Sequence, residues 1–123
     1  MSAIGATRGA IADGYIPDGS TGPAPEMTSH EAVCLLNAGE RDAAVEITLF
    51  FADRAPVGPY RLTGPGERTL HQRFNDLEDP QPVPRGTSYA CLITSDHPLV
   101  VQHARLDSRQ AENALLNTIA FPG

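Results

Sequence analysis

The chain has 123 residues, of which 41% are hydrophobic and 20% charged, a composition that excludes a disordered or membrane-spanning chain. Nine basic residues, all arginine, stand against fifteen acidic ones for a net charge of −6, and the arginines are scattered from Arg8 to Arg109, which argues against a nucleic-acid partner. The apolar runs are shorter than the ~20 residues of a spanning helix and no secretory leader is visible, so we expect one cytoplasmic domain over residues 1–123.

Eleven glycines and eleven prolines punctuate the sequence at short intervals, and segments rich in Val, Ile, Leu, Thr and Phe lie between them. This rhythm is typical of an all-β domain. The clearest alternation places Val45, Ile47, Leu49 and Phe51 on one face of a strand. Eight strands are predicted, in chain order Gly9–Ile16, His30–Asn37, Ala44–Ala52, Tyr60–Leu62, Glu67–Phe74, Ser88–Thr94, Leu99–Leu106 and Leu115–Phe121.

Helical structure is expected at most as a short turn near residues 107–113, where Asp107 and Gln110 resemble a capping arrangement. The two cysteines, Cys34 and Cys91, lie in apolar strand-like runs, and we interpret both as reduced core residues.

Motifs for catalysis or metal binding are missing from the sequence. The four histidines each stand alone, without the H-x-H pair of a cupin-like metal site, and no G-x-S-x-G elbow or P-loop occurs. We therefore predict no metal, no cofactor and no enzymatic activity. The remaining enzymatic alternative is action on a sugar, with His103 and Asp107 as an acid–base pair on one strand face.

Two dense polar clusters lie at predicted strand ends. One is Arg73-Phe74-Asn75-Asp76, and the other extends from Gln102 to Gln110. The second strand begins as Leu99-Val100-Val101, and period-2 geometry then places Val101, His103, Arg105 and Asp107 on one face. Such a strand leaves the core for a cleft or an interface. Arginine forks and amide groups suit a hydroxyl-rich or anionic small molecule, but an ion-pair network between loops or subunits explains the residues equally well.

Four blocks of the sequence resemble the Anabaena sensory rhodopsin transducer family. They read HEAVCLLNAG at 30–39, VGPYRL at 57–62, RFNDL at 73–77 and VQHARLDSRQAENALL at 101–116. The similarity extends from about Ala10 to Ala120, and its departures lie mostly in residues 17–27 and 64–72. It implies a jelly-roll-like β-sandwich of roughly eight strands, a homotetramer, and a cytoplasmic role that receives a signal from a membrane-embedded sensory rhodopsin.

The resemblance also implies a broader group of small-molecule-binding domains, whose ligands are sugars or related metabolites. Carried onto this chain, its polar motif positions are candidate ligand-binding residues: His30, Glu31, Asn37, Arg73, Asn75, Asp76, Gln102, His103, Arg105, Asp107, Arg109 and Gln110.

Two functional hypotheses follow. In the first, the chain is a non-enzymatic signal transducer that binds a sugar-like or anionic metabolite. In the second, it is a ligand-free protein-interaction subunit whose polar clusters form the oligomer interface.

Overall fold

A computed structural model describes residues 4–123 as an all-β fold, which confirms the predicted fold class. Eight strands are present, and the only helical element among the described residues is the single 3₁₀ turn η1. The elements are β1 (Ala6–Tyr15), β2 (His30–Asn37), β3 (Ala43–Phe51), β4 (Val57–Gly64), β5 (Arg68–Arg73), η1 (Phe74–Asp76), β6 (Ser88–Asp107), β7 (Ala114–Ile119) and β8 (Phe121–Pro122).

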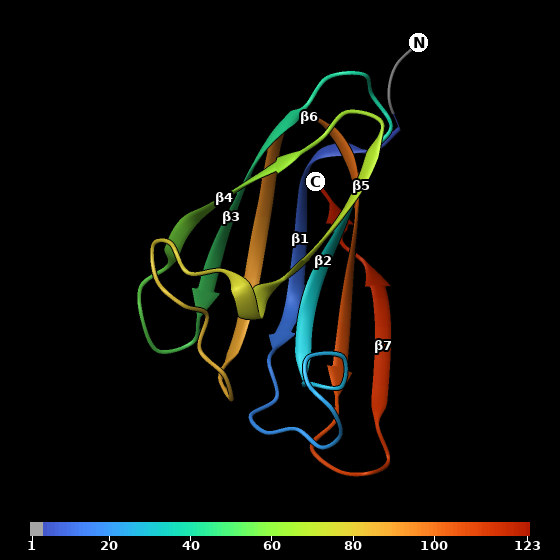
Figure 1. The fold of residues 1–123 in the computed structure, drawn as a ribbon. Coiled ribbons are helices and arrows are strands. Elements are labelled where there is room, and N and C mark those ends of the chain that lie inside the picture. The colour runs from blue at the N-terminus through green and yellow to red at the C-terminus, as the bar shows by residue number, and fades with distance from the viewer. Residues whose placement is uncertain (1–3) are drawn as a thin grey trace.

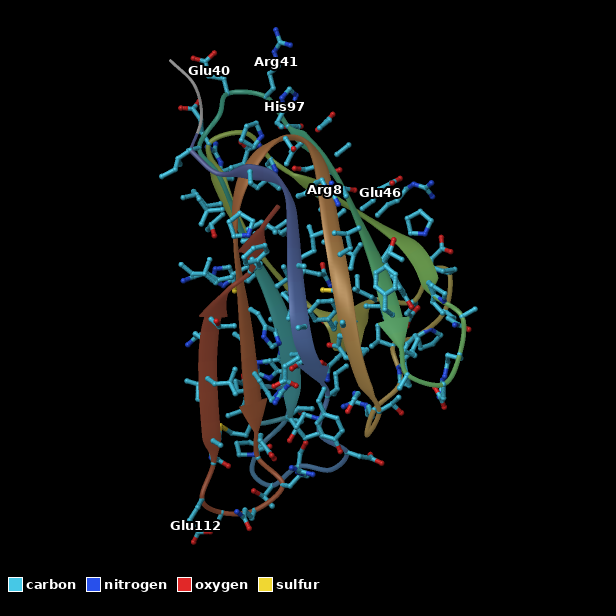
Figure 2. The ribbon with its side chains drawn as sticks, turned by 180° about the vertical axis from the view of Figure 1, so that it is seen from behind. Arg8, Glu40, Arg41, Glu46, His97 and Glu112 are labelled. Atoms are coloured by element: carbon cyan, nitrogen blue, oxygen red, sulfur yellow. The ribbon has the colours of Figure 1, made fainter. Side chains whose placement is uncertain are left out.

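Strand β6 belongs to two antiparallel layers. Its first part pairs with β3 and β1, and its second part, from Val100 onward, pairs with β2 and β7. The first sheet therefore has the order β4-β3-β6-β1-β8, and the second has the order β5-β2-β6-β7. In Figure 1, β6 rises beside β3, arches over the top of the molecule and descends between β2 and β7. His97 marks this arch in Figure 2, and Glu112 marks the opposite end, in the β6–β7 loop.

The two sheets bury one hydrophobic core between them. Strand β3 supplies Val45, Ile47 and Leu49, each at most 1% exposed, so the alternation in this strand is confirmed at these positions. Phe51 is half-buried and packs against the same core. Strand β2 contributes Val33 and Leu35 from the second sheet.

The predicted strand break near Pro98 was wrong. The two strands expected at 88–94 and 99–106 form the single strand β6, and Pro98 is tolerated there because it faces a register irregularity of β1 between Ala6 and Arg8. The short helical turn that the sequence allowed at most near residues 107–113 does not form. The carboxylate of Asp107 instead accepts a hydrogen bond from the backbone N–H of Arg109, only two residues later, which makes a side-chain turn rather than a helix cap.

Candidate functional site

A carboxylate lies in the core, at the position of β2 where an apolar side chain would be expected. Glu31 is 0% exposed and shares the inward face of its strand with Val33 and Leu35. An unpaired buried carboxylate would be very costly, so its partners decide whether the fold tolerates it.

Three side chains donate hydrogen bonds to this carboxylate. His103 Nε2 and Arg105 Nε, both from β6, lie 2.9 and 2.6 Å from Glu31 Oε2. The hydroxyl of Tyr89 reaches Oε1 from the part of β6 that belongs to the first sheet. The imidazole is assigned the tautomer with its proton on Nε2, because the Glu31 oxygen accepts. These four residues are called the Glu31 network below.

Arg105 supplies the positive charge of the Glu31 network. Its second contact is with Asp13 of β1, whose carbonyl oxygen and Oδ1 lie 3.2 and 3.4 Å from a terminal guanidinium nitrogen. Burial disfavours the guanidinium charge, but the carboxylates of Glu31 and Asp13 outweigh it and raise the pKa of Arg105. The arginine therefore remains charged and links β1 to the second sheet.

Burial keeps the neighbouring acidic groups of β6 protonated. It raises the pKa of the Tyr89 phenol strongly, and the adjacent Glu31 carboxylate raises it further. Burial, with a further contribution from Glu31, also raises the pKa of the Cys91 thiol to about 12. Tyr89 is thus a hydrogen-bond donor throughout the physiological pH range.

A cavity of about 430 Å³ opens between β1 and β7, with His103 in its wall. Ile11 and Asp13 line it from β1, and Leu116 and Thr118 line it from β7. His103 is only 2% exposed, and its Nδ1 has no hydrogen-bond partner within residues 4–123. No fully enclosed side-chain nitrogen or oxygen in that range lacks a partner, so Nδ1 is not fully enclosed, and the cavity is the open space that His103 lines.

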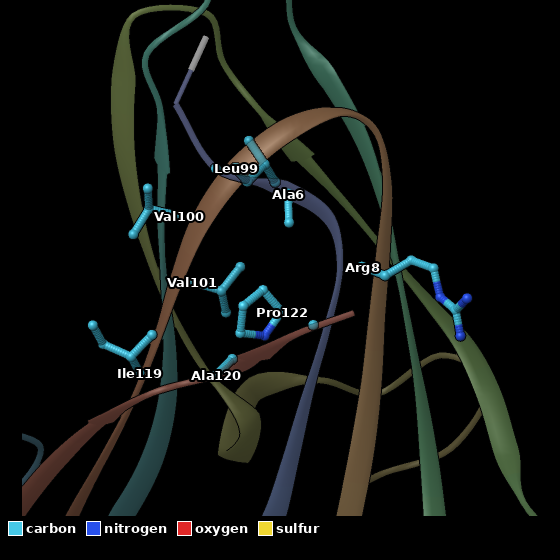
Figure 3. Close-up of a pocket in the computed structure, with 10 residues that line it drawn as sticks. Ala6, Arg8, Leu99, Val100, Val101, Ile119, Ala120 and Pro122 are labelled. Carbon is cyan, nitrogen blue, oxygen red and sulfur yellow. The ribbon is translucent and has the colours of Figure 1, made fainter.

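A second cavity, of about 280 Å³, lies beneath the β6 arch. Figure 3 shows its walls, which are formed mainly by apolar residues such as Leu99, Val101, Ala120 and Pro122. The labelled side chain of Arg8 extends away from these walls. The cavity near His103 is therefore the one that combines a buried ionic network with open space.

Asp107 and Arg109 form a separate ion pair at the end of β6. Their shortest N–O distance is 2.6 Å, and the guanidinium of Arg109 lies over the ring of Tyr15 at 5.8 Å. The hydrogen bond from Arg109 lowers the pKa of Asp107. This pair is partly exposed, and it lines a small pocket of about 200 Å³ with Gln110.

The structure brings together only some of the predicted site residues. Glu31, His103 and Arg105 meet in one network, whereas Asp107 and Arg109 form their own pair at a separate small pocket. Of the twelve predicted residues, only His103 lines the cavity between β1 and β7. Seven of them belong neither to the Glu31 network nor to the Asp107–Arg109 pair: His30, Asn37, Arg73, Asn75, Asp76, Gln102 and Gln110.

Four of these seven hold loops in place. Asn37 bonds the carbonyl oxygens of Arg41 and Gly64, and Arg73 bonds that of Pro25. Asn75 accepts from the Glu31 backbone N–H and donates to the Ser29 carbonyl, and His30 Nδ1 bonds the Thr28 carbonyl. The side chains of Asp76, Gln102 and Gln110 are exposed.

Two members of the site, Tyr89 and Asp13, were not predicted. Tyr89 is 58 positions from Glu31, and Asp13 is 92 positions from Arg105. Gly14 was a further signal, because it pairs with Tyr89 and a side chain there would overlap the tyrosine ring. A glycine inside a strand indicates such a close approach, although it does not identify the partner.

The described residues contain no cluster of three His, Cys, Asp or Glu side chains that could hold a metal ion. Nor does any helix in that part of the chain have the length and apolar character needed to cross a membrane.

Comparison with known proteins points to one family. The family model described as Anabaena sensory rhodopsin transducer matches residues 4–122. The solved structure named Anabaena sensory rhodopsin transducer is 57% identical, with a TM-score of 0.77, and the match covers 86% of this chain and 100% of that one. A crystal structure from Thermotoga maritima is 32% identical, with a TM-score of 0.87, and covers 97% of this chain and 96% of its own. None of the curated proteins matches the chain.

Proposed function

Because the chain belongs to the Anabaena sensory rhodopsin transducer family, we propose that it is a signalling module that catalyses no reaction and responds to a small, sugar-like metabolite. The ligand would enter the cavity between β1 and β7. The observation that carries this proposal is His103, which is nearly fully buried, bonds Glu31 through one ring nitrogen, has no partner on the other within the described residues, and lines the cavity.

The Glu31 network would connect the cavity to the rest of the fold. His103 and Arg105 hold Glu31 in the second sheet, and Tyr89 holds it from the first. A ligand that tightens or loosens the His103–Glu31 contact would therefore change how the sheets are joined. The signal would be a population shift, in which the ligand binds one arrangement more tightly than the other.

The arrangement of His103 and Asp107 supports a non-catalytic role. His103 bonds the Glu31 carboxylate, whereas Asp107 is paired with Arg109. The two side chains thus have separate partners, and the acid–base pair considered from the sequence loses its support.

The proposed partners are a membrane-embedded sensory rhodopsin and further copies of this chain. The rhodopsin is suggested by the name of the 57% identical relative. Self-assembly, most simply a tetramer, is supported by the outer face of the second sheet, where Leu36, Leu115 and Ile119 are 43%, 69% and 65% exposed. Burying such side chains favours association.

The alternative is a ligand-free interaction subunit. It is favoured by β7, whose six residues are all exposed and include no charged side chain. On this view the cavity would be a by-product of the spacing between β1 and β7, and the apolar edge would be the functional surface.

A thermal-shift screen of sugars and related metabolites separates the two functions. A ligand that binds only the folded protein raises its melting temperature by mass action. The proposal expects stabilisation that is lost in Leu116→Trp, in which the larger side chain fills the cavity. If no compound stabilises the wild-type protein, the ligand-free function is the correct one.

A further inference from the structure

We infer that the cavity between β1 and β7 selects a small amine: a ligand with an apolar body and an ammonium group that donates hydrogen bonds to His103 Nδ1 and Asp13. This inference rests on the proposed function, because it names the chemistry of the ligand that would occupy the same cavity. It keeps the cavity of the proposed function but replaces the sugar-like ligand, and it also departs from the anionic ligand that the arginines in the sequence allowed.

The first step concerns the free nitrogen of His103. Its Nε2 donates to Glu31 Oε2 at 2.9 Å, so the proton of a neutral imidazole is on that nitrogen. Nδ1 then carries a lone pair and can only accept. A ligand group that contacts it must therefore be a donor, such as an ammonium or a hydroxyl group.

The second step concerns Asp13, on the opposite wall of the cavity. Its side chain is 88% exposed, and Arg105 engages only Oδ1, at 3.4 Å. Within the part of the chain that the structure describes, Oδ2 has no hydrogen-bond partner. The cavity thus offers a second acceptor, and this one carries a negative charge.

The third step is the charge balance. Glu31 and Asp13 are two carboxylates, and among the described residues Arg105 is the one guanidinium that contacts them; their other ionisable partner is the imidazole of His103, which bonds Glu31. A carboxylate or phosphate entering the cavity would approach the charge of Asp13, and the guanidinium of Arg105 is already engaged. An ammonium group would instead balance the remaining negative charge.

The remaining walls define the rest of the ligand. Ala10 and Ala12 of β1 line the cavity, together with Leu116 on the inward face of β7 and Phe121 of β8. These side chains offer hydrocarbon surface and no charge, so they favour an apolar ligand body. Thr118 adds one hydroxyl group, which can either donate or accept.

Three probes with one hydrocarbon body test the inference: cyclohexylmethylamine, cyclohexylmethanol and cyclohexanecarboxylate. Each is titrated into the full-length protein by isothermal calorimetry at neutral pH. We expect the amine to bind at least about tenfold more tightly than the alcohol, because a charge-assisted hydrogen bond is stronger than a neutral one. No binding of the carboxylate is expected.

Two pairs of variants locate the binding. Asp13→Asn should weaken amine binding about tenfold and leave alcohol binding unchanged, whereas Asp18→Asn, which alters an exposed carboxylate outside the cavity wall, should change neither. Leu116→Trp should abolish binding of both probes. Asn117→Trp, the next position of β7 and on its other face, should preserve it.

The outcomes separate this inference from the proposed function. If the carboxylate binds as tightly as the amine and Leu116→Trp abolishes both, the cavity is a ligand site but its selection for amines is wrong. Amine binding that survives Leu116→Trp or ignores Asp13→Asn also overturns the inference, because the amine then binds elsewhere. If none of the probes binds, the inference is overturned, and the screen of sugars and related metabolites alone decides whether the cavity is a ligand site.

Discussion

Tyr89 and Glu31 join the two sheets through a hydrogen bond between their side chains. Tyr89 lies in the part of β6 that pairs with β3, and Glu31 lies in β2 of the second sheet. Both side chains are buried, and the ring of Phe74 packs 5.6 Å from that of Tyr89. The core is therefore held by a specific polar contact as well as by hydrophobic packing.

Replacing Glu31 by Gln should destabilise the fold strongly. The amide keeps the shape but leaves the Arg105 guanidinium without its closest carboxylate. We expect the free energy of unfolding to fall by about 2 to 4 kcal/mol. This is at the low end of what breaking a buried ion pair costs, because the Arg105 side chain is 15% exposed. Urea denaturation measures it. Glu112→Gln, at an exposed loop position, is the matched control, and an equal effect in both variants would contradict the assignment.

Stability should fall in alkaline solution. Burial raises the pKa of Cys91 from 9.0 to about 12 and also raises that of Tyr89, so the unfolded chain loses these protons first. Their contribution is fully present below about pH 9 and is lost as the pH rises toward the folded values. Each group lowers the unfolding free energy by about 1.4 kcal/mol per pH unit. Denaturation series at increasing pH should show a shallower decline in Cys91→Ala, and an unchanged decline would exclude this thiol as a cause.

Gly14→Ala should displace Tyr89. A methyl group at this position would overlap the tyrosine ring, whereas one at Gly9 of the same strand would make an ordinary contact, 3.5 Å from the Ala120 Cβ. We expect Gly14→Ala to cost about 1 to 3 kcal/mol and to alter the near-ultraviolet circular dichroism of the tyrosines. Gly9→Ala should retain the wild-type spectrum. A wild-type spectrum in both variants would show that the ring does not rest on Gly14.

Asp107→Asn should change stability little. The partner of Asp107 is the exposed Arg109, and exposed ion pairs are screened by solvent. The hydrogen bond from Arg109 lowers the pKa of Asp107, so the small contribution of the pair is present above the ordinary value of 3.8 and is lost as the pH falls through the lowered one. Urea denaturation at neutral and acidic pH checks this. A loss as large as that of Glu31→Gln would place Asp107 inside the buried network.

Charge on the outer face of the second sheet should reduce self-assembly. Leu36 and Phe50 have similar exposure, 43% and 41%, but Leu36 lies on that face, and Phe50 belongs to β3 in the first sheet. Leu36→Glu should lower the molar mass measured by light scattering, whereas Phe50→Glu should leave it unchanged. If Phe50→Glu alone lowers the mass, the copies associate through the first sheet.

Local patterns were sufficient to predict much of the fold. Strand β2 has the predicted bounds, His30–Asn37, because an apolar run there is bounded by polar residues. The break expected near Pro98 was wrong for a nonlocal reason: the missing N–H of Pro98 is harmless only because β1 loses register beside it. A pairing irregularity of that kind has no signature in the sequence of β6.

The site was predictable only in part for a similar reason. His103 and Arg105 stand out as polar residues on the inward face of a strand that begins with apolar ones. Tyr89 resembles any core aromatic residue, and Asp13 resembles any surface carboxylate, so neither shows its partner until the sheets are packed. The cavity was not predictable, since its walls come from β1 and β7, which lie at opposite ends of the chain.

The sharing of β6 by both sheets has a consequence for how this family can diverge. Tyr89 and His103 lie on the same strand and contact the same carboxylate, so the number of residues between them fixes which side chains face inward. A single insertion or deletion there would turn Gln102 or Ala104 toward Glu31 in place of His103. Evolution can therefore exchange the outward-facing residues of this stretch, but it cannot readily change its length.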